Sequence, residues 1–424
     1  MNNSDSSHHS ESSFTRKFLF WLLALFLLES IFSGALRYGL ANVHLSALIY
    51  IPKFLLLLAV VVVPLARGRL NISFFLISLA LFGYMILGLV ILPSQKQALF
   101  GIWILVPFLF GLLAGPLLIR EPKELCGLIA FMFWVAWLGL IINTFVNYPW
   151  IGSSYHLAGV SLETSRQWYN SFSLSRLPGF SRASFTVASQ LLMFGVFLVF
   201  SLRSNIVRVL TWMAAGLGIL LTTAKGPFGA WLIISVYLVT QIWGLKQLWN
   251  VPLILVAVAV AALPVSSLLV HYSFYLGHLS GANPLSSFSD RLDWMWPESL
   301  KLISQPWQWF IGRGIGGIGI PQKFFSGRHF MPADNFFVYL CVDFGLLGAV
   351  GFFTICVWAA LRHHRSALTL IGSGFATILA VLAYGGVVNV VEDSMLMLFI
   401  AFQIAIAFDH EVSLSVICGF VQVK

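Results

Sequence analysis

The chain has 424 residues, of which 59% are hydrophobic and only 9% carry a charge, with a formal net charge of +9. Soluble proteins are about 45–50% apolar and about 25% charged, so this composition excludes a cytosolic enzyme and a disordered chain. It also excludes a nucleic-acid binder, because basic residues in so apolar a chain are first explained by orientation in a membrane.

Runs of mostly apolar residues recur along the whole chain. A helix that spans a bilayer needs about 20 such residues, and about twelve runs meet this criterion. They lie near 17–36, 45–66, 70–92, 98–119, 125–146, 185–202, 207–224, 227–243, 250–270, 334–361, 367–388 and 393–410. The sequence therefore predicts an all-α, polytopic membrane helix bundle with about twelve transmembrane helices. A single transmembrane domain covers 17–410, between a disordered cytoplasmic tail at 1–16 and a cytoplasmic tail at 411–424.

The distribution of positive charge orients this bundle. Most short loops rich in arginine and lysine fall on one side if the N-terminus is cytoplasmic, as the positive-inside rule requires, and both termini are then cytoplasmic. Two long polar segments, 147–184 and 271–333, lie on the outer face, and the second contains short amphipathic helices. Their basic residues are Arg166, Arg176, Arg182, Arg291, Lys301, Arg313, Lys323 and Arg328. Orientation does not require these charges, so they indicate an anionic ligand, and phosphate-bearing lipid is the plainest candidate.

The end of the first long segment and the hairpin that follows place basic residues beside predicted spans. Arg176 and Arg182 precede the run near 185–202, where an arginine either contacts lipid headgroups or helps to hold a phosphate. Lys225 belongs to the tight outer turn Thr-Thr-Ala-Lys-Gly-Pro at 222–227, which Gly-Pro punctuates. Its ammonium group either snorkels to the interface or pairs with phosphate.

A helix is expected at 287–303 in the second long segment. Ser287 and Asp290 form a capping-box pattern. The apolar stripe that follows at helical spacing consists of Leu292, Trp296, Leu300 and Ile303. An amphipathic helix lying in the membrane interface explains this pattern, and Arg291 at its start is placed to bind a lipid phosphate. The two roles are compatible.

The glycine-rich run 312–319 and the residues around Asp334 each allow two interpretations. The glycines around Arg313 either present backbone N–H groups to an anion or fold a tight loop, and no βαβ pattern supports a dinucleotide site. Asp334, followed by Asn335 at the start of a span, is either a helix N-cap or a catalytic base. No cysteine or histidine spacing suits a metal, so no metal or other cofactor is expected.

These motifs occur in an order that resembles a known family. An arginine-rich first outer segment precedes the Thr-Thr-Ala-Lys-Gly turn at 222–226. A larger outer segment follows, with Arg291 and Trp296 five positions apart, the Gly-x-Gly run, and Asp334-Asn335 before a span that contains Gly-Leu-Leu-Gly at 345–348. Over roughly residues 170–360, the chain resembles the O-antigen polymerase and O-antigen ligase superfamily of bacterial inner membranes.

Two departures from the family pattern favour the polymerases slightly. Members typically have Ser-Arg where this chain has Ala224-Lys225, and His-Asn where it has Asp334-Asn335. Lysine keeps the positive charge but loses the bidentate fork of arginine, and aspartate can accept a proton as histidine does. Histidine is usual at this position in the ligases, which places the chain away from them.

The resemblance implies a metal-independent glycosyltransferase. It would polymerise undecaprenyl-pyrophosphate-linked oligosaccharide repeat units into O-antigen or exopolysaccharide at the periplasmic face of the bacterial inner membrane. On this resemblance Asp334 is the general base, Arg291 and Lys225 hold the donor pyrophosphate, and Arg176 positions lipid-linked sugar. The other candidate substrate-binding residues are Arg182, Arg313, Asn335 and Trp296.

Two alternatives stay open. A ligase would use the same donor but transfer the polysaccharide to lipid A–core. A transporter or flippase of lipid-linked sugar would instead need polar residues distributed through many spans, whereas here they gather at the outer mouth, which favours an enzyme. Membrane lipids and, in the same pathway, a chain-length regulator and a flippase are the expected partners.

Overall fold

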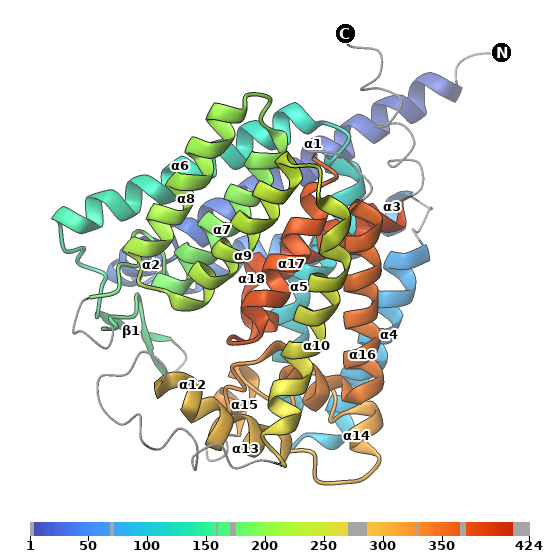
Figure 1. Ribbon diagram of the computed structural model, residues 1–424. Coiled ribbons are helices and arrows are strands. Elements are labelled where there is room, and N and C mark those ends of the chain that lie inside the picture. The colour runs from blue at the N-terminus through green and yellow to red at the C-terminus, as the bar shows by residue number, and fades with distance from the viewer. Residues whose placement is uncertain are drawn as a thin grey trace.

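The computed structural model describes residues 4–67, 72–157, 160–169, 175–269, 286–326, 330–364 and 370–409. Arg328 and the predicted tail 411–424 lie outside these residues. The described chain is a bundle of helices with one two-stranded antiparallel sheet, in which Ser154 lies opposite Glu163 (Figure 1). The predicted all-α helical bundle is confirmed.

The elements follow one another along the chain with short connections. The first half contains α1 (Ser4–Ile31), α2 (Ser33–Asn42), η1 (Ser46–Tyr50), α3 (Ile51–Arg67), α4 (Ile72–Ile91), α5 (Gln95–Leu118), α6 (Pro122–Phe145), β1 (Ser154–Leu157), β2 (Val160–Glu163), α7 (Ser184–Ser201) and α8 (Asn205–Leu221). The second half contains α9 (Lys225–Ile242), η2 (Lys246–Trp249), α10 (Asn250–Ser266), α12 (Ser286–Asp290), the π-helical turn η4 (Arg291–Met295), α13 (Trp296–Leu300), α14 (Gln308–Ile311), α15 (Ile320–Phe325), α16 (Phe336–His364), α17 (Ser373–Gly385), η6 (Val390–Glu392) and α18 (Ser394–Phe408). Helix α1 thus begins within the segment predicted as a disordered tail.

Fewer helices than predicted reach membrane-spanning length. Within the described residues, six helices are long and apolar enough to cross a membrane, and a seventh span results if α1 and α2, bent by 80°, count as one. Helices α8, α10, α17 and α18 are apolar but have only 10–17 residues, against the about 20 that a bilayer requires. The structure therefore indicates a helical membrane protein, and the predicted count of about twelve spans is not confirmed.

Helices α5 and α18 form the centre of the bundle. Nearly all side chains of α18 are buried, and it packs along α5, with α17 beside it (Figure 1). Gly115 of α5 lies so close to Phe402 that an added Cβ would be 2.9 Å from the Phe402 carbonyl oxygen. Such small residues let two helix backbones approach closely, which favours packing between membrane helices. A short helix is stable here because protein surrounds it on all sides.

The first outer segment is fastened to the bend between α1 and α2. The backbone N–H of Gly34 donates to the Phe180 carbonyl at 3.0 Å, and the Phe32 and Phe180 rings stack with centroids 4.9 Å apart. The Ser181 hydroxyl donates to the Ile31 carbonyl at 3.0 Å. The break at Phe32 leaves backbone groups without partners in the helix, and residues 180–181 supply those hydrogen bonds. These contacts fix the chain just before Arg182.

The second outer segment is fastened to a break inside α16. Gly345 has φ +68°, so the helix kinks there. The Arg313 N–H donates to the Val342 carbonyl at 2.8 Å, and the Gly314 N–H donates to the Asp343 carbonyl at 2.9 Å. Carbonyl groups freed by the kink thus bind the glycine-rich run. The short helices α12 to α15 gather at one end of the bundle, and α1 begins at the opposite end (Figure 1).

Candidate functional site

Asp334 and Arg291 form an ion pair between the chain just before α16 and the turn η4. The Arg291 Nη2 donates to Asp334 Oδ2 at 2.8 Å, and the two side chains are 18% and 29% exposed. Arg291 opens the π-helical turn η4, and its Nη1 also donates to the Ser287 carbonyl at 2.6 Å. Single π-helical turns occur frequently at functional sites. The structure brings together the two residues that the sequence analysis assigned to catalysis.

The backbone that carries Asp334 is strained. Ala333 and Asp334 have φ values of +61° and +45°, and left-handed conformations at two successive non-glycine residues are costly. Asn335 holds this conformation from one side: its Oδ1 accepts the Val338 N–H at 3.0 Å, and its Nδ2 donates to the Val260 and Gly386 carbonyls. Asn335 is therefore the N-cap of α16, a role considered for Asp334, and the Asp334 side chain is left for its ion pair.

Asn335 itself has no exposed surface. Its amide group is engaged by backbone atoms of α10, α16 and the end of α17. Asn335 therefore has a structural role in place of the predicted contact with substrate, because no part of it reaches the outer surface.

Three arginine side chains share an unusual feature. The Nε atoms of Arg176, Arg182 and Arg291 are buried and have no hydrogen-bond partner within the part of the chain that the structure describes. A buried donor without a partner is unfavourable and calls for an explanation. All three residues were predicted to act on substrate, and an anionic group placed against these guanidinium groups would satisfy the unpaired donors.

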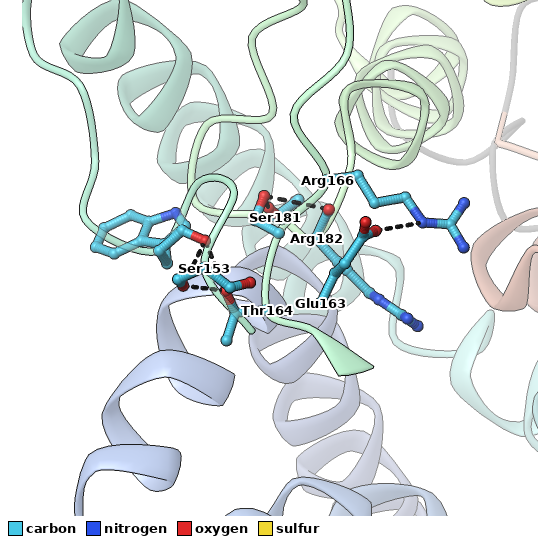
Figure 2. Close-up of polar contacts among 8 residues, drawn as sticks. Ser153, Glu163, Thr164, Arg166, Ser181 and Arg182 are labelled. Carbon is cyan, nitrogen blue, oxygen red and sulfur yellow. Dashed lines mark hydrogen bonds and ion pairs between the residues drawn. The ribbon is translucent and has the colours of Figure 1, made fainter. Parts of the chain in front are cut away.

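Arg182 lies in a region of concentrated positive charge. Burial, together with the nearby guanidinium groups of Arg37 and Arg166, lowers the pKa of Arg182 to about 10. Its backbone is fixed on both sides, because its N–H donates to Ser33 Oγ at 3.0 Å and its carbonyl accepts the Arg166 N–H at 2.8 Å. The side chains of Arg166 and Arg182 extend to the same side of the loop (Figure 2). Positive charge concentrated in this way favours the binding of an anionic ligand.

Arg166 is partly neutralised. Its Nε lies 3.5 Å from Glu163 Oε2, and its guanidinium group lies over the Trp168 ring, 5.3 Å from the centroid. The hairpin of β1 and β2, which ends at Glu163, thus orients the arginine (Figure 2). An ion pair exposed in this way is weak, so Arg166 can also respond to other charges nearby.

The glycine-rich run is a tight loop. Its N–H groups donate to oxygen atoms of the protein at Arg313, Gly314, Ile315, Gly316, Gly317 and Gly319. The interpretation of this run as a tight loop is therefore favoured over an anion cradle, because these donors are already occupied. The Arg313 side chain is tied to the loop as well, since its Nη1 donates to the Gly317 carbonyl at 3.2 Å.

Trp296 and Lys225 occupy very different positions. Trp296 has no exposed surface and packs edge-on against Phe288, with ring centroids 5.8 Å apart. It anchors the second outer segment and cannot stack on a sugar, contrary to the prediction that it binds substrate. Lys225 begins α9, two residues after Thr223, which has φ +53°. A Cβ at the next residue, Gly226, would collide with the Tyr384 ring, and Tyr384 lies within electrostatic reach of Asp334 and Arg291.

Glu392 also belongs to this region, although no sequence pattern predicted it. Its carboxylate interacts electrostatically with both Asp334 and Arg166, so the first outer segment, the second outer segment and the chain before α18 meet around it. No motif marks Glu392, since it lies in a three-residue turn between two apolar helices.

No cluster of metal ligands accompanies these groups. Among the described residues, no three His, Cys, Asp or Glu side chains lie together as a metal ion would need. The arrangement offers positive charge and a carboxylate, which suit proton transfer and the binding of an anion.

The comparison with models of known protein families found no match. The comparison with curated proteins found no match either. The resemblance to the O-antigen polymerase and ligase superfamily therefore depends on the short motifs alone.

Proposed function

We propose that the chain is a glycosyltransferase that polymerises undecaprenyl-pyrophosphate-linked oligosaccharide repeat units into O-antigen or exopolysaccharide. The observation that carries the proposal is the Asp334–Arg291 pair, in which a carboxylate on strained backbone lies 2.8 Å from a guanidinium group whose Nε has no partner among the described residues. Sugar transfer from pyrophosphate needs both a proton acceptor and a cation for the leaving group.

The chemistry assigns a role to each group. The acceptor hydroxyl oxygen attacks the anomeric carbon of the donor sugar, and its proton passes to Asp334. The bond from this carbon to the pyrophosphate oxygen breaks, and the electron pair leaves with undecaprenyl pyrophosphate. Burial raises the pKa of Asp334, against the opposing effect of Arg291, and this favours proton acceptance.

Positive charge on the leaving group lowers the barrier, because negative charge grows on the pyrophosphate as the bond breaks. Arg291 and Lys225 are assigned to this pyrophosphate, and Arg176 and Arg182 to lipid-linked sugar. Arg313 is left out of the set because its side chain serves the tight loop.

The proposal includes the setting of the reaction. The protein would lie in the bacterial inner membrane with both termini in the cytoplasm and the two outer segments in the periplasm. Membrane lipids surround it, and a flippase and a chain-length regulator of the same pathway would deliver its substrate and limit its product.

The glycans of a deletion strain test the activity. Loss of a polymerase is expected to leave single repeat units on the cell surface and no long chains, because each unit is still exported and attached. Separation of surface and lipid-linked glycans by gel electrophoresis and mass spectrometry would detect this. Accumulated lipid-linked polymer would instead indicate the ligase, and repeat units held on the cytoplasmic face would indicate the flippase.

The topology makes a separate prediction. Alkaline phosphatase fused after residue 310 is expected to be active, because α14 would lie in the periplasm, where this reporter folds. A fusion after residue 67, at the end of α3, is the matched cytoplasmic control and is expected to be inactive. Activity in the second fusion and not in the first would contradict the orientation.

A further inference from the structure

Glu392 is an acidic residue whose interactions reach three separate parts of the described chain. It ends η6, the single turn between α17 and α18. Its neighbour Asp393 has a simple role, because Asp393 Oδ1 accepts the Met395 and Leu396 N–H groups and so caps α18. The Glu392 side chain makes no contact of this kind with its own helix and instead reaches the second outer segment.

The carboxylate of Glu392 binds the start of α15. The Ile320 N–H donates to Glu392 Oε1 at 2.5 Å, across 72 residues of sequence. Gly319, with φ +77°, permits this approach, because a Cβ there would collide with the carboxylate. The contact is therefore built into the loop, since both the backbone angle and the lack of a side chain at residue 319 are needed for it.

Glu392 also contacts the helix that follows Asp334. The Tyr339 side chain is hydrogen-bonded to the Glu392 carboxylate, and Tyr339 is 1% exposed. The Tyr339 N–H donates to the Asn335 carbonyl at 3.1 Å, which places Tyr339 one turn beyond the strained pair at 333–334. Glu392 thus connects the turn at 319–320 with the first turn of α16.

Charged groups surround Glu392 from several elements. Asp334 before α16 and Asp343 within α16 repel its carboxylate, while Arg166 of the first outer segment attracts it. Burial and the nearby Asp334 carboxylate raise the pKa of Glu392 to about 7, against the opposing effects of the Ile320 N–H and Arg166. Its charge therefore changes near neutral pH, close to a carboxylate assigned to proton transfer.

We propose that Glu392 is a positioning residue of the transfer site. Its carboxylate fastens the turn at Gly319–Ile320 to the start of α16 and acts as a like charge on Asp334. The effect on Asp334 rests on the proposed function, whereas the attachment of the turn at Gly319–Ile320 is a property of the fold alone. Glu392 need not touch the sugar or the pyrophosphate for either effect.

Two substitutions separate the two effects. Glu392→Gln keeps an oxygen that accepts the Ile320 N–H but removes the charge, whereas Glu392→Ala removes both. Asp393→Asn is the matched control, because it removes a charge at the next residue and keeps an oxygen that caps α18.

The first measurement is the pH dependence of chain extension by purified full-length protein, with lipid-linked repeat units as substrate. Loss of a neighbouring negative charge lowers the proton affinity of Asp334. Glu392 carries this charge only above about pH 7, where its pKa lies. The wild-type rate is therefore expected to rise through this range, and Glu392→Gln is expected to lose this rise, with a lower rate above it and KM unchanged. Asp393→Asn is expected to keep the wild-type profile. An unchanged profile in Glu392→Gln, or equal shifts in both variants, would overturn the electrostatic part.

The second measurement is hydrogen–deuterium exchange over residues 315–326, which requires no activity. Glu392→Ala is expected to speed exchange in this segment at least about tenfold, because the Ile320 N–H loses its acceptor, and Glu392→Gln is expected to change it little. Equal protection in wild type and Glu392→Ala would overturn the fastening. If the wild-type protein had no transferase activity, the proposed function and the effect of Glu392 on Asp334 would both be wrong. The exchange measurement would still show whether Glu392 holds the turn at Gly319–Ile320.

Discussion

Replacement of Asp334 by asparagine, or of Arg291 by alanine, is expected to abolish chain extension while the protein remains folded and inserted. Asparagine tolerates the left-handed backbone at residue 334, where φ is +45°, so Asp334→Asn removes the proton acceptor with little change in the backbone. Loss of a general base lowers the rate by about 10²–10⁴-fold. Surface polysaccharide of the complemented deletion strain, compared at equal protein level, measures the effect.

Arg291 is expected to respond differently to two substitutions. Arg291→Ala leaves Asp334 partly buried without its partner at 2.8 Å, and Arg291→Lys keeps the charge but loses the planar fork that binds Asp334 and presents Nε. The lysine variant is therefore expected to retain a small part of the activity. Asp293→Asn is the control, since Asp293 lies in the same π-helical turn but is exposed, and its side chain accepts a hydrogen bond from the Ser289 hydroxyl at 3.0 Å.

Normal long-chain polysaccharide in Asp334→Asn and Arg291→Ala would contradict the catalytic assignment. Equal loss in Asp293→Asn would also contradict it, because the effect would then belong to the whole turn. Low protein in the membrane fraction would point to folding, and for this reason the asparagine variant, which preserves shape, is the decisive one.

The helical bundle could be predicted because the length and composition of each apolar run are properties of the local sequence. The lengths of α17 and α18, 13 and 15 residues, could not be predicted, because an apolar run does not mark where a helix ends. Helix α18 is buried along α5 at glycines 111 and 115, and nothing in its own sequence predicts this burial. The 80° bend after Ile31 likewise depends on residues 180–181, which are remote in sequence.

Part of the candidate site could be predicted from residue type alone. Arginines beside the predicted spans indicated an anion, and Arg176, Arg182 and Arg291 share a buried Nε that has no partner in the described chain, which is costly unless a ligand supplies one. Trp296 and Asn335 could not be assigned in this way, because burial decides between packing and binding and the sequence does not state it. Glu392 was missed since its partners, Ile320 and Tyr339, lie far from it in sequence.

Gly345→Ala is expected to lower the thermal stability of the protein more than any other single glycine substitution in α16. The residue has φ +68°, which costs about 1–3 kcal/mol for a non-glycine residue. An added Cβ would also collide with the Phe310 carbonyl and lie 2.5 Å from the Gly312 backbone nitrogen. Both contacts are with backbone, which cannot turn aside as a flexible side chain can.

The substitution is therefore expected to push α14 and the glycine-rich run away from α16, with a fall of several degrees in the melting temperature measured in detergent. Gly351→Ala in the same helix is the control. A Cβ at Gly351 meets nothing within 4 Å, and alanine is the better helix former by about 1 kcal/mol, so its stability is expected to be equal or higher. If both variants had the same melting temperature, the kink would not hold the second outer segment. The position of Arg291 opposite Asp334 would then need another cause.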